Sequence, residues 1–298
     1  MQISDNTRGA LLMIGSMVAF TINDAFLKAV SDELPLFQAL FLRGLGTVVC
    51  LGVLARALGQ WRTDFDAKVW GFIAIRSLAE VVAAVFFLTA LFNMPLANVT
   101  AVLQALPLTV TLAGAVFLGE AIGWRRMSAI LVGFLGVFLI VRPGADGFNG
   151  YSLYALAAVA CVTVRDLAAR KLPPDVPSVM VALVAALSVL LLSGIACATQ
   201  TWVPVTLTAS AQLLGAMCAI VFGYVFSVAA MRTGELGFVA PFRYAGLIAA
   251  LFLGWVIFAE WPDRLTLLGA AIVVATGVFT LMRERKSRLK ARLIGRQR

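Results

Sequence analysis

The feature that most constrains this chain is a succession of long apolar runs with little sequence between them. Of its 298 residues, 61% are hydrophobic and 13% are charged, whereas a soluble domain carries about a quarter charged residues. A helix needs roughly 20 mainly apolar residues to cross the core of a bilayer. Ten such runs are present, at residues 9–30, 35–55, 70–91, 97–118, 126–141, 150–170, 178–199, 212–231, 238–259 and 264–282. Strands of a membrane barrel would alternate polar and apolar residues. These runs do not, so the sequence predicts an all-α integral membrane protein with ten transmembrane helices.

The distribution of Lys and Arg predicts the orientation of the chain. With the N-terminus placed in the cytoplasm, seventeen of the 24 Lys and Arg residues fall in cytoplasmic segments and three at outer ends. Cytoplasmic loops carry such an excess, so we expect a multi-pass protein of the bacterial inner membrane with both termini in the cytoplasm. This pattern explains the net charge of +9 without a nucleic-acid partner. We expect the basic tail, residues 283–298, to fix the topology, with binding to anionic lipid headgroups as the alternative.

The two halves of the chain share spaced polar residues, which predicts an internal duplication. The stretches TINDAFLKAVSDELP (21–35) and TVRDLAARKLPPDVP (163–177) place Thr, Asp, a basic residue and Pro at the same spacing. PLANVTAVLQALPLTVTLAGAVFLGE (95–120) also matches ELGFVAPFRYAGLIAALFLGWVIFAE (235–260), at an offset of 140 residues.

We therefore predict two repeats, residues 1–145 and 146–282, followed by the basic tail. Each repeat contains five spans, an odd number, so the second repeat enters the membrane from the opposite side. Inverted repeats of this kind are an architecture of secondary transporters.

With these features the chain resembles the ten-helix EamA-type members of the drug/metabolite transporter superfamily. The resemblance is carried by the two five-helix halves, by Glu120 and Glu260 at the ends of the fourth and ninth spans, and by Pro241–Tyr244 within FVAPFRYAG. The opening DNTRGALLMIGSMVAFTINDAFLK, with LPLFQALFLRG, looks like bacterial members assigned to riboflavin uptake. The resemblance implies a secondary transporter of a small metabolite, with riboflavin or a similar planar, polar metabolite as the substrate. An exporter of amino acids or of another metabolite, such as one like S-adenosylmethionine, is the alternative.

Charged residues inside the spans are candidates for gating, because each costs about 2.5–3.5 kcal/mol to insert. The candidate gating residues are Asp24, Lys28, Arg43, Arg165 and Asp166. Inversion places Asp24 toward the outer mouth and Asp166 toward the cytoplasmic mouth. We expect Asp24 to pair with Lys28 or Arg43, and Asp166 to pair with Arg165 or Arg76, each pair forming when its own mouth closes. The alternative is that these charges clamp helices together.

Polar residues in the third, fourth and ninth spans are candidates for substrate binding. Thr100 and Gln104 lie on one face of the fourth span, and Tyr244 occupies the position that matches Gln104 in the second half, with Arg243 beside it. Arg76 and Glu80 are i, i+4 neighbours that can pair in the third span. The candidate substrate-binding residues are therefore Gln104, Tyr244, Arg243, Thr100, Arg76 and Glu80. Polar packing between helices is the alternative for the fourth and ninth spans.

The sequence motifs of ATP-driven pumps and of common hydrolytic enzymes are absent from this chain. The chain has no Walker A, HExxH or GxSxG motif and no His, so we expect no enzyme activity, catalytic residue, metal or cofactor. A non-transporting scaffold is a remote alternative. The predicted partners are a small-molecule substrate and the lipid bilayer. Gly133 and Gly136 give the fifth span a small-residue face, either for dimerisation or for packing within the chain. The sequence leaves open the direction of transport, the coupling ion and the oligomeric state.

Overall fold

The computed structural model describes residues 4–119, 122–142, 149–233 and 236–295. These residues form α-helices and one 3-10 helix, without a strand, and include ten segments long and apolar enough to cross a membrane. The helices are α1 (Asp5–Val30), α2 (Leu36–Ala57), α3 (Ala67–Asn93), α4 (Leu96–Leu103), α5 (Leu106–Leu118), α6 (Trp124–Val141), α7 (Tyr151–Arg170), α8 (Ser178–Ala198), α9 (Leu207–Thr233), α10 (Leu236–Val239), the 3-10 helix η1 (Ala240–Tyr244), α11 (Ala245–Phe258) and α12 (Arg264–Gly295). The predicted all-α membrane fold with ten spans is confirmed.

The chain divides into two compact units, and each unit combines segments of both predicted repeats. Unit 1 contains Met1–Thr21, Pro95–Asn149 and Phe222–Arg298, and unit 2 contains Ile22–Met94 and Gly150–Val221. The helices α1 and α9 contribute residues to both units. The compact units therefore do not follow the predicted repeat boundary near residue 145. The repeats remain a prediction about the origin and topology of the chain.

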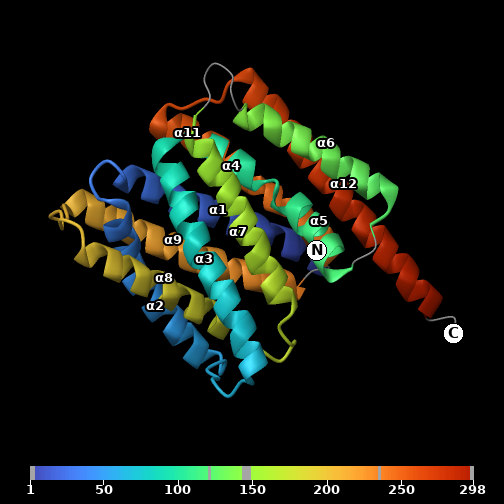
Figure 1. Ribbon diagram of the computed structural model, residues 1–298, viewed down its shortest axis with the longest axis horizontal. Coiled ribbons are helices and arrows are strands. Elements are labelled where there is room, and N and C mark those ends of the chain that lie inside the picture. The colour runs from blue at the N-terminus through green and yellow to red at the C-terminus, as the bar shows by residue number, and fades with distance from the viewer. Residues whose placement is uncertain (1–3, 120–121, 143–148, 234–235, 296–298) are drawn as a thin grey trace. The chain divides into compact units, whose positions relative to one another are not determined.

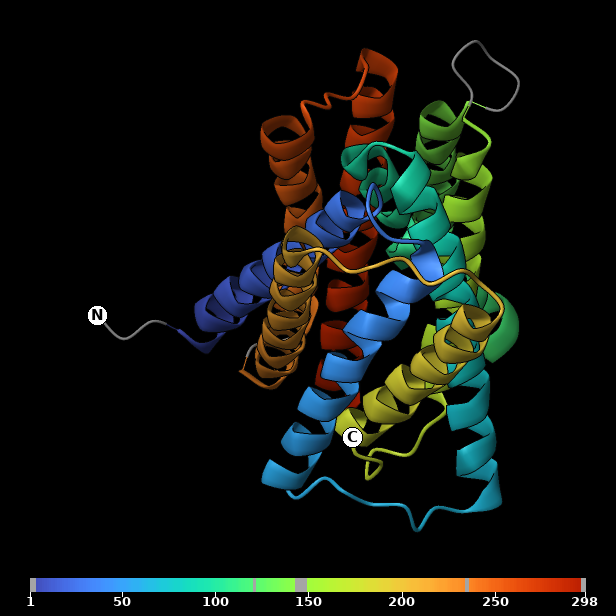
Figure 2. The same ribbon diagram turned by 90° about the vertical axis from the view of Figure 1, so that its left-hand side faces the viewer.

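Unit 2 is built around α3, which packs against α7 and α8, while α2 runs alongside α8 (Figure 2). Apolar side chains join these helices. Ile73 of α3 is fully buried against Val181 of α8 and against Val176, which lies in the segment that precedes α8. Burying such a side chain stabilises the fold by roughly 1.5–3 kcal/mol.

Unit 1 contains the close pair α6 and α12, which lie side by side (Figure 1). A Cβ atom built on Gly269 of α12 would lie 2.5 Å from the carbonyl oxygen of Gly136 in α6. A Cβ atom on Gly133 would lie 2.2 Å from the Leu108 side chain. Small residues allow helix backbones to approach closely in membranes. Packing within the chain therefore accounts for the small-residue face of the fifth span.

Contacts near the helix ends join segments that the ten-span topology places on the same side of the membrane. On the predicted outer side, Gln38 Nε2 donates to Val203 O (2.6 Å) and Val203 N donates to Gln38 Oε1 (3.0 Å). On the predicted inner side, Arg62 lies 3.5 Å from Asp175. These contacts agree with the predicted alternation of the spans.

The segment before α12 is held by Arg142 and Asp263 in unit 1. Arg142 ends α6 with a left-handed backbone (φ 46), and its guanidinium pairs with the Asp263 carboxylate and donates to Thr266. Asp263 also accepts the N–H groups of Leu265 (2.9 Å) and Thr266 (3.0 Å), which caps the start of α12. Burial acts to raise the pKa of Asp263, but the hydrogen bonds from Thr266 and Arg142 outweigh it and hold the pKa below the ordinary 3.8.

We expect Asp263→Ala to lower the free energy of unfolding by about 0.5–2 kcal/mol, the usual cost of removing a helix N-cap. Asp263→Asn keeps a capping oxygen and should lose less. Because the folded-state pKa is depressed, the stabilisation is present above about pH 4 and is lost as the pH falls through the lowered pKa. The thermal midpoints of wild type and Asp263→Ala in detergent should therefore converge at low pH. Midpoints that stay equally far apart would contradict the role of the carboxylate charge.

The last helix continues past the point where the tail was predicted to begin. Residue 283 lies inside α12, which continues to Gly295. The sequence RERKSRLKARLI after Met282 contains mainly Arg, Lys, Leu and Ala, which favour helix, and contains no Gly or Pro to stop it. The predicted cytoplasmic tail is therefore helical up to Gly295, and residues 296–298 lie outside the described residues.

Candidate functional site

The fourth span is interrupted in its middle. α4 ends at Leu103 and α5 begins at Leu106. At the interruption the Gln104 N–H is shared between Thr100 O (3.1 Å) and Ala101 O (3.2 Å), and the Ala105 N–H donates to Val102 O (3.1 Å) in a bond of the 3-10 type. Pro107 explains the change, because it has no N–H to donate to Leu103 O and its ring crowds that carbonyl group.

The ninth span is interrupted at the matching place. α10 gives way to η1 at Ala240, and α11 begins at Ala245. At the 140-residue offset, Gln104 and Ala105 correspond to Tyr244 and Ala245. Here Pro241 lies within the 3-10 helix and removes one N–H from the ladder. A stretch of 3-10 helix within a longer helix often marks a functional hinge, so each half of the chain contains one candidate hinge.

Three of the four predicted binding residues of unit 1 lie at these interruptions, and the fourth lies one turn away. Gln104 is partly buried at the break, and Thr100 donates its hydroxyl to Leu96 O of its own helix (2.9 Å). Arg243 is exposed. Tyr244 is only 5% exposed. A Cβ atom on Gly277 would lie 1.6 Å from the Tyr244 hydroxyl, so this ring packs directly on the backbone of α12.

Glu260 joins the two interrupted spans. α4 packs against α11, and the Glu260 carboxylate, two residues after α11, accepts the N–H of Leu96 at the start of α4 (3.1 Å). The first N–H groups of a helix have no partner in the helix, and a negative charge is favourable there. Glu260, which carries part of the resemblance to the family, therefore also caps the start of the fourth span. Its counterpart Glu120 lies outside the described residues.

The first charged cluster in unit 2 contains Asp24, Asn23 and Arg43. Asn23 Nδ2 donates to Asp24 Oδ1 (2.9 Å), and Arg43 NH1 donates to Asn23 Oδ1 (3.3 Å). The predicted ion pair between Asp24 and Arg43 is thus replaced by a bridge through a neutral amide. Asn23 is 4% exposed, and sequence analysis missed it. Its position next to Asp24, a carboxylate inside a span, was the sequence signal that could have identified it.

Lys28, the other cation predicted for Asp24, binds the end of α3. Its Nζ donates to Met94 O (2.6 Å) and Leu91 O (3.5 Å). The last carbonyl groups of a helix lack intrahelical donors and attract cations. Lys28 therefore caps α3 in this structure.

The second charged cluster contains Glu80 of α3 and Arg165 and Asp166 of α7. Arg165 NH1 lies 3.1 Å from Glu80 Oε2, and Arg165 NH2 lies 2.9 Å from Asp166 Oδ1. The contact between Asp166 and Arg165 is one of the two that were predicted. In contrast, the described residues contain no ion pair between Arg76 and Glu80. The close packing of α3 on α7 brings Arg165 to Glu80, and Arg76 donates to Val181 O of α8 instead (3.5 Å).

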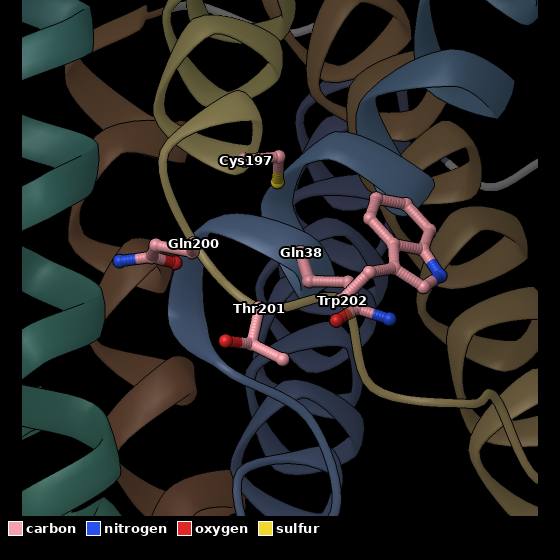
Figure 3. A pocket seen from close by; sticks show the side chains of 5 residues that line it. All are labelled: Gln38, Cys197, Gln200, Thr201 and Trp202. Carbon is pink, nitrogen blue, oxygen red and sulfur yellow. The ribbon is translucent and has the colours of Figure 1, made fainter.

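A small hollow near the predicted outer side of unit 2 is not large enough to be a substrate site. It is lined by Gln38, Cys197, Gln200, Thr201 and Trp202 (Figure 3). Its 140 Å³ of empty volume includes open solvent, whereas ligand pockets measure about 300–1,000 Å³. The Gln200 side chain points away from Gln38 in Figure 3. The hollow is a gap beside the segment that joins α8 to α9.

Known proteins resemble this chain over nearly its whole length. A riboflavin transporter of Vibrio cholerae is 30% identical over 293 residues, covering 96% of this chain and 97% of that protein. An S-adenosylmethionine uptake transporter of Rickettsia bellii is 25% identical, with 92% and 94% covered. The pseudopaline exporter CntI of Pseudomonas aeruginosa is 27% identical, with 89% and 93% covered.

The fold and one family model agree with these relatives. A solved crystal structure with 18% sequence identity superposes with a TM-score of 0.61, covering 93% of this chain and 98% of that chain, which shows a shared fold. The model of the EamA-like transporter family matches residues 7–142. The chain therefore belongs to the EamA-like transporter family, within the drug/metabolite transporter superfamily.

Proposed function

We propose that this protein is a secondary transporter that moves riboflavin, or a similar planar, polar metabolite, by alternating access. The observation that carries the proposal is the pair of interrupted spans with breaks at equivalent positions. Discontinuous helices expose backbone polar groups near the midplane, and secondary transporters use them to bind substrate. The 30% identity to a riboflavin transporter favours this substrate. The excess of Lys and Arg in the predicted inner segments supports a bacterial inner-membrane protein with both termini in the cytoplasm.

The binding residues of this proposal are Gln104 and Arg243 at the two breaks, supported by Thr100. Gln104 offers an amide donor and acceptor, and Arg243 offers a charged donor. Tyr244 contributes mainly by packing on α12, because its hydroxyl lies against Gly277. Arg76 and Glu80 belong to unit 2, where Glu80 pairs with Arg165.

The charged clusters of unit 2 are the proposed gates. Asp24, Asn23 and Arg43 lie toward the predicted outer end, and Arg165 and Asp166 lie toward the predicted inner end. An ion pair that forms in one conformation and breaks in the other shifts the balance between them, as differential binding requires. Lys28 would hold the end of α3 next to the outer gate.

Transport of a different solute, or export instead of import, is a second candidate function that the same experiment can test. Two relatives at similar identity are named for S-adenosylmethionine uptake and pseudopaline export, so the solute and the direction can differ from riboflavin import. Purified protein in liposomes should be tested for exchange of riboflavin, S-adenosylmethionine and amino acids across the membrane. We expect saturable exchange of riboflavin. If only another solute exchanges, that solute replaces riboflavin as the proposed substrate. If none of them exchanges, the proposal that the protein transports one of these solutes is wrong.

We expect Gln104→Ala to weaken the apparent affinity for the transported solute roughly 2- to 10-fold, because it removes a hydrogen bond worth about 0.5–1.5 kcal/mol. Gln200→Ala is the matched control, since it removes the same side chain from an exposed position outside the spans. Tyr244→Ala would be a poorer test, because it leaves a cavity against α12. Equal affinities for Gln104→Ala and wild type would remove Gln104 from the site.

A further inference from the structure

The three carboxylates well inside the described spans, Asp24, Glu80 and Asp166, have different surroundings. Glu80 and Asp166 both contact the guanidinium of Arg165, at 3.1 and 2.9 Å. Asp24 accepts a hydrogen bond from the Asn23 amide at 2.9 Å. No Lys or Arg of the described ranges lies within ion-pair distance of Asp24. It is therefore the membrane carboxylate whose charge is least compensated.

The helices around Asp24 carry two cations, Arg43 and Lys28, and each is bonded to another group. From α2, Arg43 acts on Asp24 electrostatically and is bonded to the intervening Asn23. On α1 itself, Lys28 is bound to the carbonyl groups at the end of α3. The part of α9 that packs here, with Gly215 against Phe26, contains no ionisable side chain except Cys218 between residues 207 and 221. The last residues of α3 and the residue that follows it, Leu91 to Met94, contain no ionisable side chain.

This arrangement accommodates both protonation states of Asp24. An ionised carboxylate accepts the Asn23 amide hydrogen, and the carbonyl oxygen of a neutral carboxyl group can accept it too, in a weaker bond. Arg43 keeps its bond to Asn23 Oδ1 in either state. A charge within a span is costly unless it is paired, and a bound proton removes that cost at Asp24. At Glu80 or Asp166, a proton would instead weaken a direct ion pair.

We propose that Asp24 is the proton-binding residue that couples transport to the proton gradient. This inference rests on the proposed transport function. A proton enters from the aqueous phase, binds one carboxylate oxygen of Asp24, and is released to the other side when the conformation changes. Asn23 is a positioning residue that holds the carboxyl group in both states.

The first test compares gradient-driven and gradient-free transport in liposomes, with whichever solute of the panel exchanges in wild type. At one proton per solute, a gradient of one pH unit sustains up to about tenfold accumulation. We expect wild type to accumulate the solute and Asp24→Asn to equilibrate it without accumulation. Asp166→Asn should still accumulate the solute, even if more slowly. Accumulation by Asp24→Asn, or none by wild type, would overturn the proposal.

A second measurement does not depend on the solute. Infrared difference spectra of the purified protein, recorded between two pH values, should contain a protonated-carboxyl band that Asp24→Asn removes and Asp166→Asn retains. The same band in Asp24→Asn would overturn the proposal even if no solute of the panel were transported. Failure of the riboflavin assignment is thus distinguishable from failure of the proton site.

Discussion

We expect Arg165→Met to be recovered from membranes in much lower yield than wild type and to unfold at a lower temperature. The substitution leaves Glu80 and Asp166 without the guanidinium that both contact. Removing one partner of a buried ion pair costs about 3–5 kcal/mol. The three side chains are only partly buried within the fold, at 23–31% exposed, so the lower end of that range applies. Thermal unfolding in detergent measures the effect, and Arg165→Lys, which keeps a positive charge, should lose less.

The triple variant Glu80→Gln, Arg165→Met and Asp166→Asn separates a gate from a clamp. It removes the uncompensated charges together with the cation, so it should recover most of the stability lost by Arg165→Met alone. If the cluster is a gate, the triple variant folds but transports poorly, and cysteine accessibility at the two faces differs from wild type. If it folds and transports normally, the charges only hold α3 to α7.

We expect Gly269→Ala to destabilise the protein, although alanine is the better helix former. The new Cβ would lie 2.5 Å from Gly136 O and 2.8 Å from the Ile140 side chain, so α6 and α12 must move apart. Overpacking of this kind costs about 1–3 kcal/mol, which exceeds the gain of up to about 1 kcal/mol in helix propensity. The measurement is the thermal midpoint of the purified protein in detergent.

Gly52→Ala is the matched control for this substitution. It lies in α2, where a Cβ atom would meet nothing within 4 Å, so only the propensity gain should remain and the midpoint should stay or rise. If both variants behave alike, the close crossing of α6 and α12 does not limit stability.

The sequence predicted those features that depend on length and composition. Runs of about 20 apolar residues predicted ten helical spans, because only helices and closed barrels cross a bilayer and these runs lack the alternation of barrel strands. The pairing of Asp166 with Arg165 could be proposed because both lie inside one span and a lone charge there is costly.

Other features depend on which helices pack against one another, and the hydropathy of a sequence does not predict these contacts. Glu80 was assigned to Arg76 by spacing, but the packing of α3 on α7 decided its partner. Hydropathy does not reveal the breaks at Gln104 and Tyr244, because the residues on either side are apolar. Pro107 and Pro241 were the sequence signals for these breaks. The role of Glu260 as a cap on Leu96 also required two distant segments to be brought together.

The continuity of α12 has a mechanical consequence. The span ends near Arg283, but the helix continues without a break to Gly295, and twelve further residues extend a helix by about 18 Å. A helix is stiff over such a length, so the extension moves as one rigid body with the last span. A change of 10° in the tilt of α12 would displace its end by roughly 3 Å. A spectroscopic label near Gly295 would therefore report movements of the last span from outside the membrane.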